Sequence, residues 1–412
     1  MVFRSVLAAV LSCAALATHA ALTVSTDFES GSARVLALNP ETQELRISPA
    51  GDPARGMPNW WFLRVDHVDP GKPLLLEVVA RVAEAPQEGA AESNIAPLNP
   101  GWTLPARAAI STNGLDWFQS SPGKRHGSQS LYQIETGATS LWIALAPPFP
   151  PRNATALIQD TARAHPFAKP FTLATSREGR PVVGLQISEG AKPSSQRPAV
   201  FVTARQHAWE VGGTWVAAGL IEWATGPDPE AQWLRRNAEL LVVPLMDVDH
   251  VATGDGGKNA EPQDHNRDWS DAPHWPEVAA AQKRIRELAQ QNRLAVFLDV
   301  HDPSPGATLQ TFYVQHPPYV SDAIAAAQEQ FLSLAKSEFG EIKRNDGTPS
   351  KPADLPVWKR ISTPWVCEHG CTNTIAFTFE TPWNIPRGTP AGYRDVGAKL
   401  GRATARYLAG SP

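Results

Sequence analysis

The sequence predicts two domains: an antiparallel β-sandwich, followed by an α/β domain whose mixed, mainly parallel sheet carries helices on both faces. Three observations lead to this prediction. The chain has 412 residues, which is enough for two domains of roughly 150 residues or more. Short strand-like runs separated by turn residues extend to about residue 157. After residue 169, dense apolar strands alternate with helical stretches.

The first domain is predicted from runs such as 60–65, 74–79 and 140–145, which are apolar or alternate between apolar and polar residues. Clusters of Pro, Gly, Asn and Ser separate them, and no long 3.6-residue periodicity appears, which is typical of a sandwich. The Pro-rich run 146–152 is a natural domain edge. We therefore expect the sandwich within residues 21–160.

The second domain, expected over residues 165–412, contains four dense apolar strands and three long helical patterns. The strands are predicted at 182–187, 199–204, 240–245 and 294–299, and the helices at 276–291, 323–339 and 391–408. Strands that alternate with helices predict a mainly parallel sheet covered on both faces. Ligands of such sheets bind at the carboxyl ends of the strands.

Composition excludes several classes of protein. Hydrophobic residues make up 42% and charged residues 19% of the chain, which excludes a disordered or coiled-coil protein. The formal net charge of -4 provides no basic surface for nucleic acid. Past residue 20 no apolar run approaches the ~18 residues that a membrane span requires.

Residues 1–20 are typical of a secretory signal. Arg4 precedes an apolar run, and the small residues around Ala20 mark a possible cleavage site. A lipid anchor at Cys13 is an alternative, although the apolar run before it is short. We expect export, with the mature chain periplasmic or secreted.

Cleavage would leave two cysteines, Cys367 and Cys371. In an oxidising compartment such a pair favours a disulfide. Free thiols remain an alternative, and so does a metal pair with His369 between the cysteines. Zinc sites built on cysteines usually show a second pair of ligands elsewhere, which is missing here.

Three candidate metal ligands follow predicted strands. His207 and Glu210 come after the strand at 199–204, and His301 comes after the strand at 294–299. Two imidazoles and one carboxylate form a catalytic zinc set with a fourth position open for water. Each residue alone is more often structural, since a lone His is usually a satisfied core residue and a Glu can cap a helix or form an ion pair.

Two further motifs strengthen the zinc hypothesis. In the loop 264–269, Arg267 offers a rigid fork for a carboxylate, and Asn266 can donate beside it. The apolar run 376–379 ends at Glu380. A desolvated carboxylate at a strand end near zinc is well placed to act as a general base.

The ordered set of H-x-x-E, D-x-N-R, a distant H and a strand-end E resembles the M14 zinc carboxypeptidases. The run 60–65 and the run 110–117 in turn resemble the N-terminal sandwich of the cytosolic-carboxypeptidase branch. The resemblance implies Zn²⁺ bound by His207, Glu210 and His301, and it implies an orienting role for Asp264. It also implies that Asn266 and Arg267 hold the substrate's carboxylate and that Glu380 is the base, and hence that the chain hydrolyses a C-terminal peptide or isopeptide bond.

Two departures from the family pattern stand out. The glycine-rich loop 254–259 lacks the usual Arg, so Lys258 either replaces it at the oxyanion or is an exposed loop residue. No Tyr lies between Tyr319 and Glu380, where many members place a substrate-contacting Tyr. Alternative functions are a zinc amidohydrolase acting on cell-wall peptides or N-acyl amino acids, and a non-catalytic protein that binds peptide or glycan.

Overall fold

The computed structural model describes residues 21–52, 56–80, 98–190, 193, 196–349 and 351–410. The expected signal segment 1–20, and with it Cys13, lies outside these residues. Within them, none of the helices combines the length and the apolarity needed to cross a bilayer.

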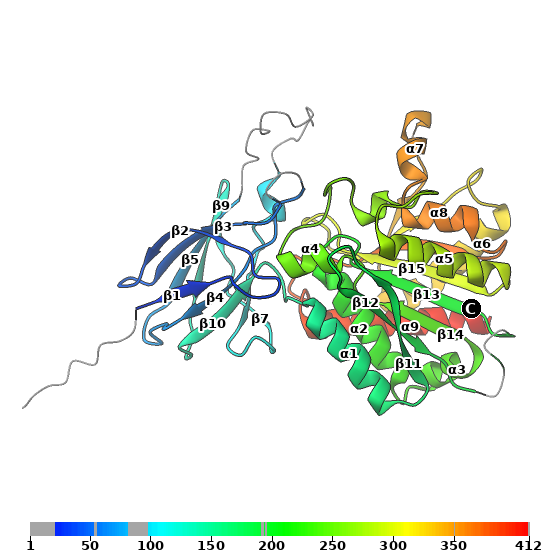
Figure 1. Cartoon of the computed structure of the whole chain (residues 1–412), viewed down its shortest axis with the longest axis horizontal. Helices are drawn as coiled ribbons and strands as arrows, with labels where there is room; N and C mark the ends of the chain where they lie inside the picture. The colour runs from blue at the N-terminus through cyan, green and yellow to red at the C-terminus, as the bar shows by residue number, and fades with distance from the viewer. Residues whose placement is uncertain are drawn as a thin grey trace, which may run out of the picture.

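Two five-stranded sheets build the first domain (Figure 1). The strands of the first sheet, in spatial order, are β1 (Thr23–Ser25), β4 (Phe62–Asp66), β10 (Ser140–Ala144), β6 (Ala109–Ser111) and β7 (Phe118–Gln119). The strands of the second sheet are β2 (Arg34–Asn39), β3 (Glu44–Ser48), β5 (Leu74–Val79), β9 (Gln129–Ile134) and β8 (Lys124–His126). A short 3₁₀ helix, η1 (Pro100–Trp102), lies between β5 and β6 in the chain.

The predicted sandwich is confirmed, and period-two alternation explains its core. In β5 the side chains of Leu74, Leu76 and Val78 are fully buried, while the residues between them are partly exposed. The pairing differs from the expected antiparallel pattern in one place, because β3 and β5 run parallel. Parallel neighbours need a long connection, and here β4 of the other sheet lies between them in the chain.

An eight-stranded mixed sheet forms the second domain. In spatial order its strands are β11 (Ala168–Thr175), β12 (Pro181–Ile187), β14 (Glu239–Val243), β13 (Ala199–Ala204), β15 (Leu294–His301), β18 (Ile375–Glu380), β16 (Thr311–Val314) and β17 (Lys343–Asp346). The four central strands β14, β13, β15 and β18 are parallel. Their carboxyl ends therefore meet at one edge of the sheet.

Helices cover both faces of this sheet (Figure 1). Four of them pack together on one face: α2 (Val211–Thr225), α3 (Pro229–Asn237), α6 (Asp322–Phe339) and α9 (Pro390–Ala409). On the other face α5 (Pro276–Gln290) packs against α8 (Ser362–His369). The remaining helical segments are α1 (Pro151–Ala164), α4 (Val248–Thr253), η3 (His265–Arg267), η4 (Pro352–Asp354) and α7 (Leu355–Trp358). Helix α1 packs on β11 and β12, so it lies with the second domain although we expected the first to reach residue 160.

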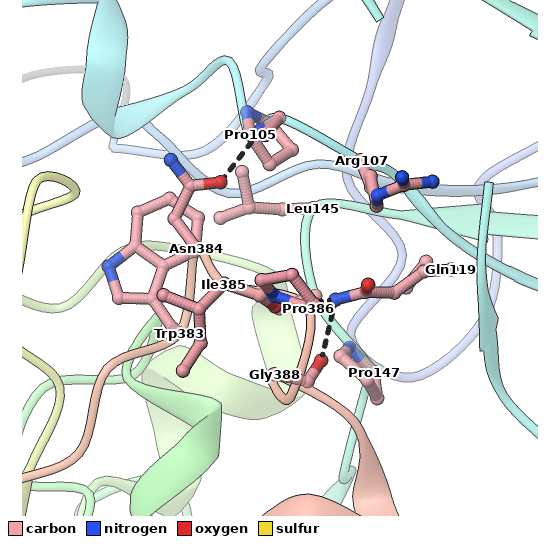
Figure 2. A pocket seen from close by; sticks show the side chains of 13 residues that line it. Pro105, Arg107, Gln119, Leu145, Pro147, Trp383, Asn384, Ile385, Pro386 and Gly388 are labelled. Carbon is pink, nitrogen blue, oxygen red and sulfur yellow. Dashed lines mark hydrogen bonds between the residues drawn. The ribbon is translucent and has the colours of Figure 1, made fainter. Parts of the chain in front are cut away.

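The two domains are tied together by hydrogen bonds (Figure 2). Asn384, in the loop after β18, accepts a bond from the backbone of Ala106 at 2.7 Å. Gln119 donates to the carbonyl of Ile385 at 2.9 Å. A small cavity of about 80 Å³ lies between these contacts, bordered by Trp383 and Arg107. The loop that follows Glu380 is therefore anchored on the sandwich.

A second junction holds the glycine-rich loop. The carboxylate of Asp52 accepts a bond from the backbone N–H of Gly256 at 2.6 Å, and Asp255 accepts one from the backbone of Asp52 at 2.7 Å. Gly256 must be a glycine, because a Cβ there would lie 2.1 Å from the carbonyl oxygen of Met57. The sandwich thus fixes the loop that carries Lys258.

The expected disulfide between Cys367 and Cys371 is not formed, and both residues are free thiols. Cys367 lies inside helix α8, whereas Cys371 follows its end, and the Sγ atom of Cys371 lies 3.8 Å from the carbonyl oxygen of Ala289. Burial raises the pKa of the Cys367 thiol to about 12. A spacing of four residues does not bring the two sulfurs together once a helix ends between them.

Candidate metal centre

The three predicted ligands converge at the carboxyl edge of the large sheet. The Nδ1 atom of His207 lies 2.8 Å from one carboxylate oxygen of Glu210, and the Nδ1 atom of His301 lies 2.7 Å from the other. All three side chains are buried, and one ligand atom from each lies within 4.8 Å of the others. The residues gather because β13 and β15 are parallel neighbours that end at the same edge.

The side chain of Glu210 is available to the histidines because another carboxylate accepts a hydrogen bond from the first turn of its helix. Glu210 is the N-cap residue of α2, but its side chain makes no capping bond. Instead Asp302, directly after His301, accepts a bond from the backbone N–H of Gly212 at 2.8 Å. A Cβ at position 212 would lie 2.5 Å from that carboxylate, so the glycine makes the close approach possible.

Each imidazole is held by a carboxylate on its far side. The Nε2 atom of His207 lies 3.3 Å from Asp264, as the resemblance implied, and that of His301 lies 2.8 Å from Asp299. Such carboxylates fix the tautomer and the orientation of a metal-binding imidazole. Asp299 was missed from the sequence. Its signal was its position two residues before His301 on one strand, which places both side chains on the same face.

The electrostatics fit a cation. Burial alone would raise the pKa of Glu210, but the two imidazoles hold that pKa well below its usual range. Burial would lower the pKa of His301, and the charges of Asp299 and Glu210 instead raise it well above its usual value. The buried centre therefore demands positive charge, which either protons or a dication can supply. Two neutral imidazoles and a carboxylate are a donor set that zinc prefers.

Glu380 and an unexpected tyrosine lie beside the metal centre. Glu380 is the last residue of β18 and pairs in register with His301. Burial raises its pKa, and the neighbouring histidines and Lys258 oppose that rise. Tyr313 comes from the antiparallel strand β16. Burial, followed by the charge of Glu380, raises the pKa of its phenol. Tyr313 was not predicted from the sequence, because the family pattern places its Tyr closer to the base along the chain.

Lys258 is held in the site by a residue of the other domain. Its Nζ atom lies 3.9 Å from Glu210 and 5.8 Å from the ring centre of Trp102, and its side chain is 30% exposed. Trp102 belongs to η1 of the sandwich and also packs against Trp209. A cation over an aromatic ring is favourable, so Lys258 is a positioned residue and not a free surface side chain.

Arg267 and Asn266 lie in η3 at the opposite side of the pocket. One guanidinium nitrogen of Arg267 donates to the carbonyl of Asn266 at 2.9 Å. The amide of Asn266 accepts from the backbone of Ser362 at 3.0 Å, and its nitrogen lies 3.2 Å from His301. Asn266 is therefore anchored at both polar atoms, and Arg267 beside it lines the pocket.

The pocket encloses about 230 Å³. It brings together the predicted metal ligands and the predicted catalytic and substrate-binding residues, while Asp264 lies behind His207. The residues that line it are His207, Glu210, Lys258, Asn266, Arg267, His301, Tyr313, Gln315, Gly347, Ile361, Pro364, Thr378 and Glu380.

Comparison with known proteins agrees with this geometry. Residues 154–301 match the Peptidase_M14 family, described as zinc carboxypeptidase. Cytosolic carboxypeptidase 2 of Xenopus tropicalis is 27% identical over 158 residues, and cytosolic carboxypeptidase 1 of Homo sapiens is 34% identical over 111 residues. These segments cover 37% and 26% of this chain, but only 16% and 9% of those longer proteins.

Solved structures match nearly the whole chain. A metallo-carboxypeptidase from Burkholderia cenocepacia covers 94% of this chain and 99% of its own, with a TM-score of 0.77 and 20% identity. A metallo-carboxypeptidase from Pseudomonas aeruginosa covers 94% and 100%, with a TM-score of 0.75 and 22% identity. Both share the two-domain fold. Residues 154–301, which contain the three predicted zinc ligands, thus match the M14 zinc carboxypeptidase family and are similar in sequence to the cytosolic carboxypeptidases.

Proposed function

We propose that this protein is a zinc-dependent carboxypeptidase that removes the C-terminal residue of a peptide or isopeptide substrate. One observation carries the proposal: the ligands His207, Glu210 and His301 share a single pocket with the carboxylate of Glu380 and the guanidinium of Arg267. That pocket combines a metal centre, a base and a group that binds a terminal carboxylate.

The substrate is positioned by charge and shape. Arg267 receives the free carboxylate through its planar fork, and the carbonyl of Asn266 holds that guanidinium in place. Beyond the charged groups, the pocket wall is formed by uncharged residues, namely Gln315, Gly347, Ile361, Pro364 and Thr378. This lining favours a C-terminal residue with a small or medium uncharged side chain.

The chemistry requires a nucleophile and a proton carrier. Zinc, when bound, acidifies a water and polarises a carbonyl. Glu380 accepts the proton of the attacking water at its carboxylate and returns it to the leaving amine. Lys258, held over Trp102, is placed to stabilise the negative charge that develops on the carbonyl oxygen. Tyr313 lines the same pocket as Glu380, and its phenol is placed to donate to that carboxylate and keep it oriented.

The test is a digest of a peptide library by the full chain, analysed by mass spectrometry with and without a zinc chelator. We expect loss of single C-terminal residues, abolished by the chelator and restored by zinc. Zinc-independent cleavage, or cleavage inside the peptides, would contradict the proposal.

Arg267 allows a matched comparison. Arg267→Ala should lower kcat/KM for free peptides by about 10²–10⁴-fold, since about two charged hydrogen bonds are lost. Arg267→Lys keeps the charge but loses the planar fork. Its kcat/KM for free peptides should therefore lie between those of the wild type and Arg267→Ala. Peptides with an amidated C-terminus should be poor substrates of every variant. An equal loss for free and amidated peptides would refute the assigned role.

We also propose that the chain is exported, to a periplasm or to the medium. Residues 1–20 support this proposal, because a positive charge is followed by an apolar run and then by small residues. N-terminal sequencing of the protein isolated from its host should begin near Ala21. A mature protein that retains Met1 would contradict export by this route.

A further inference from the structure

A second cluster of potential metal ligands lies outside the catalytic pocket. Asp247, His250 and His265 each place one ligand atom within 4.8 Å of the others, as the catalytic ligands do. Among the described residues, only these two clusters meet that criterion. Asp247 is the N-cap of α4, His250 lies in its first turn, and His265 begins η3.

The inner geometry resembles that of the catalytic centre. The Nδ1 atom of His250 lies 2.8 and 2.9 Å from the two oxygens of Asp247, and the Nδ1 atom of His265 lies 3.6 Å from one of them. In the catalytic cluster two Nδ1 atoms also face a single carboxylate, each at its own oxygen, at 2.8 and 2.7 Å. Two imidazoles and a carboxylate suit zinc or a similar divalent transition metal.

A carboxylate also fixes the outer side of one imidazole. The Nε2 atom of His265 lies 2.5 Å from Glu277, and both side chains are buried. His207 and His301 are held in the same way by Asp264 and Asp299. An N–H directed at Glu277 leaves the lone pair of Nδ1 pointing towards Asp247, which is the arrangement of a metal-binding histidine.

An unpartnered buried atom points into this cluster. His265 is fully buried, and its Nδ1 atom has no hydrogen-bond partner among the described residues. A buried polar atom without a partner is costly, and the carboxylate oxygen of Asp247, 3.6 Å away, is too distant to bond. A cation between the two atoms would satisfy both.

Charge and packing are compatible with a bound dication. Asp247 and Glu277 bring two negative charges into a region where both are buried, and one divalent ion would neutralise them while both imidazoles stay neutral. The ring of Trp275 stacks on His265 at 4.6 Å and meets His250 edge-on at 5.6 Å. The side chain of His250 is 20% exposed, so solvent can reach the cluster from that side.

We propose that Asp247, His250 and His265 form a second metal site that binds a divalent transition metal, most favourably zinc, with Glu277 orienting His265. The site is structural. It links α4, whose C-terminal end leads into the loop that carries Lys258, to η3, which carries Arg267.

Zinc stoichiometry of the full chain tests the proposal. After removal of loosely bound metal by gel filtration, elemental analysis should find two zinc ions per chain in the wild type. His207→Ala, which removes a catalytic ligand, should retain one. His250→Gln should also retain one, and the double variant none. His274→Gln is the matched control, because His274 lies beside the same Trp275 ring outside the cluster; it should retain two.

A second measurement does not depend on catalysis. In His207→Ala, a strong chelator should lower the melting temperature by several degrees, whereas it should have no effect on the double variant. A wild type with a single zinc, a His207→Ala chain with none, or a His250→Gln chain with the wild-type content would each overturn the second site.

Discussion

His301 and Glu380 lie opposite each other on the parallel strands β15 and β18, as the last residues of both. A predicted metal ligand and a predicted base are therefore fixed by backbone pairing and not by flexible loops. Preorganisation of this kind lets the base act without first having to move into place.

Glu380→Gln tests this relationship most directly. The amide keeps the size of the side chain but cannot carry a proton, so kcat should fall by about 10²–10⁴-fold. Zinc content should not change, because Glu380 is not among the ligands. Steady-state kinetics and elemental analysis check these two points. A fully active Glu380→Gln variant would exclude Glu380 as the general base.

Asp299→Asn tests the carboxylate behind His301, which was not predicted from the sequence. Loss of the charge behind His301 should weaken zinc binding by about 10–100-fold. Competition with a chromophoric chelator measures the affinity. Asp264→Asn is the companion variant, since that carboxylate holds the other histidine. If only Asp264→Asn weakened binding, Asp299 would have no part in supporting the metal.

Tyr313→Phe removes the phenol beside Glu380 and leaves the ring. One hydrogen bond is worth about 0.5–1.5 kcal/mol, so kcat/KM should fall roughly 3–10-fold. The lost donor stabilised the charged carboxylate, so the pKa of Glu380 should rise and the acid limb of the pH–rate profile should shift upwards. Tyr319→Phe, outside the pocket lining, is the control; equal effects in both variants would rule out a specific role.

Asp52→Asn tests the junction between the domains. Burial raises the pKa of Asp52 to about 7. The negative charge of Asp255 also raises this pKa, whereas the hydrogen bond from the backbone N–H of Gly256 lowers it. The folded chain therefore holds a proton that the unfolded chain loses near its ordinary value of 3.8. Stability from this group is complete below that value and is lost as the pH rises to about 7.

The Asn variant cannot ionise, so its free energy of unfolding should vary less between pH 4 and about 7. At pH 8 it should exceed the wild type by on the order of 2–4 kcal/mol, if its carbonyl still accepts from Gly256. Denaturant titrations across the pH range measure the difference. Asp69→Asn, on the exposed surface of the sandwich, should leave the curve unchanged. If the free energy of unfolding of Asp52→Asn varied with pH as steeply as that of the wild type, the raised pKa of Asp52 would be disproved.

Much of this architecture could be predicted because it follows from local patterns. The strand expected at 199–204 has those bounds, and the helix expected at 276–291 ends one residue earlier. His207, Glu210 and His301 meet because parallel strands place their ends together. Asp299 was also accessible in principle, since alternation along β15 places it on the face of His301.

Other features depend on tertiary pairing that no local pattern encodes. Tyr313 reaches Glu380 only because the edge strand β16 pairs with β18 in the antiparallel sense. Trp102 reaches Lys258 from another domain. The free state of Cys367 and Cys371 depends on where α8 ends. Each of these contacts joins segments whose separation along the chain says nothing about their distance in space.

The position of Trp102 under Lys258 has a consequence for protein engineering. Lys258 lines the reaction pocket and rests on a residue of the other domain, so excising residues 165–412 would retain the metal ligands but remove the aromatic support of this cation. Conversely, η1 offers a place to alter the surroundings of Lys258 without touching any predicted zinc ligand. Substitutions of Trp102 would therefore act on a pocket residue from outside the domain that carries the metal ligands.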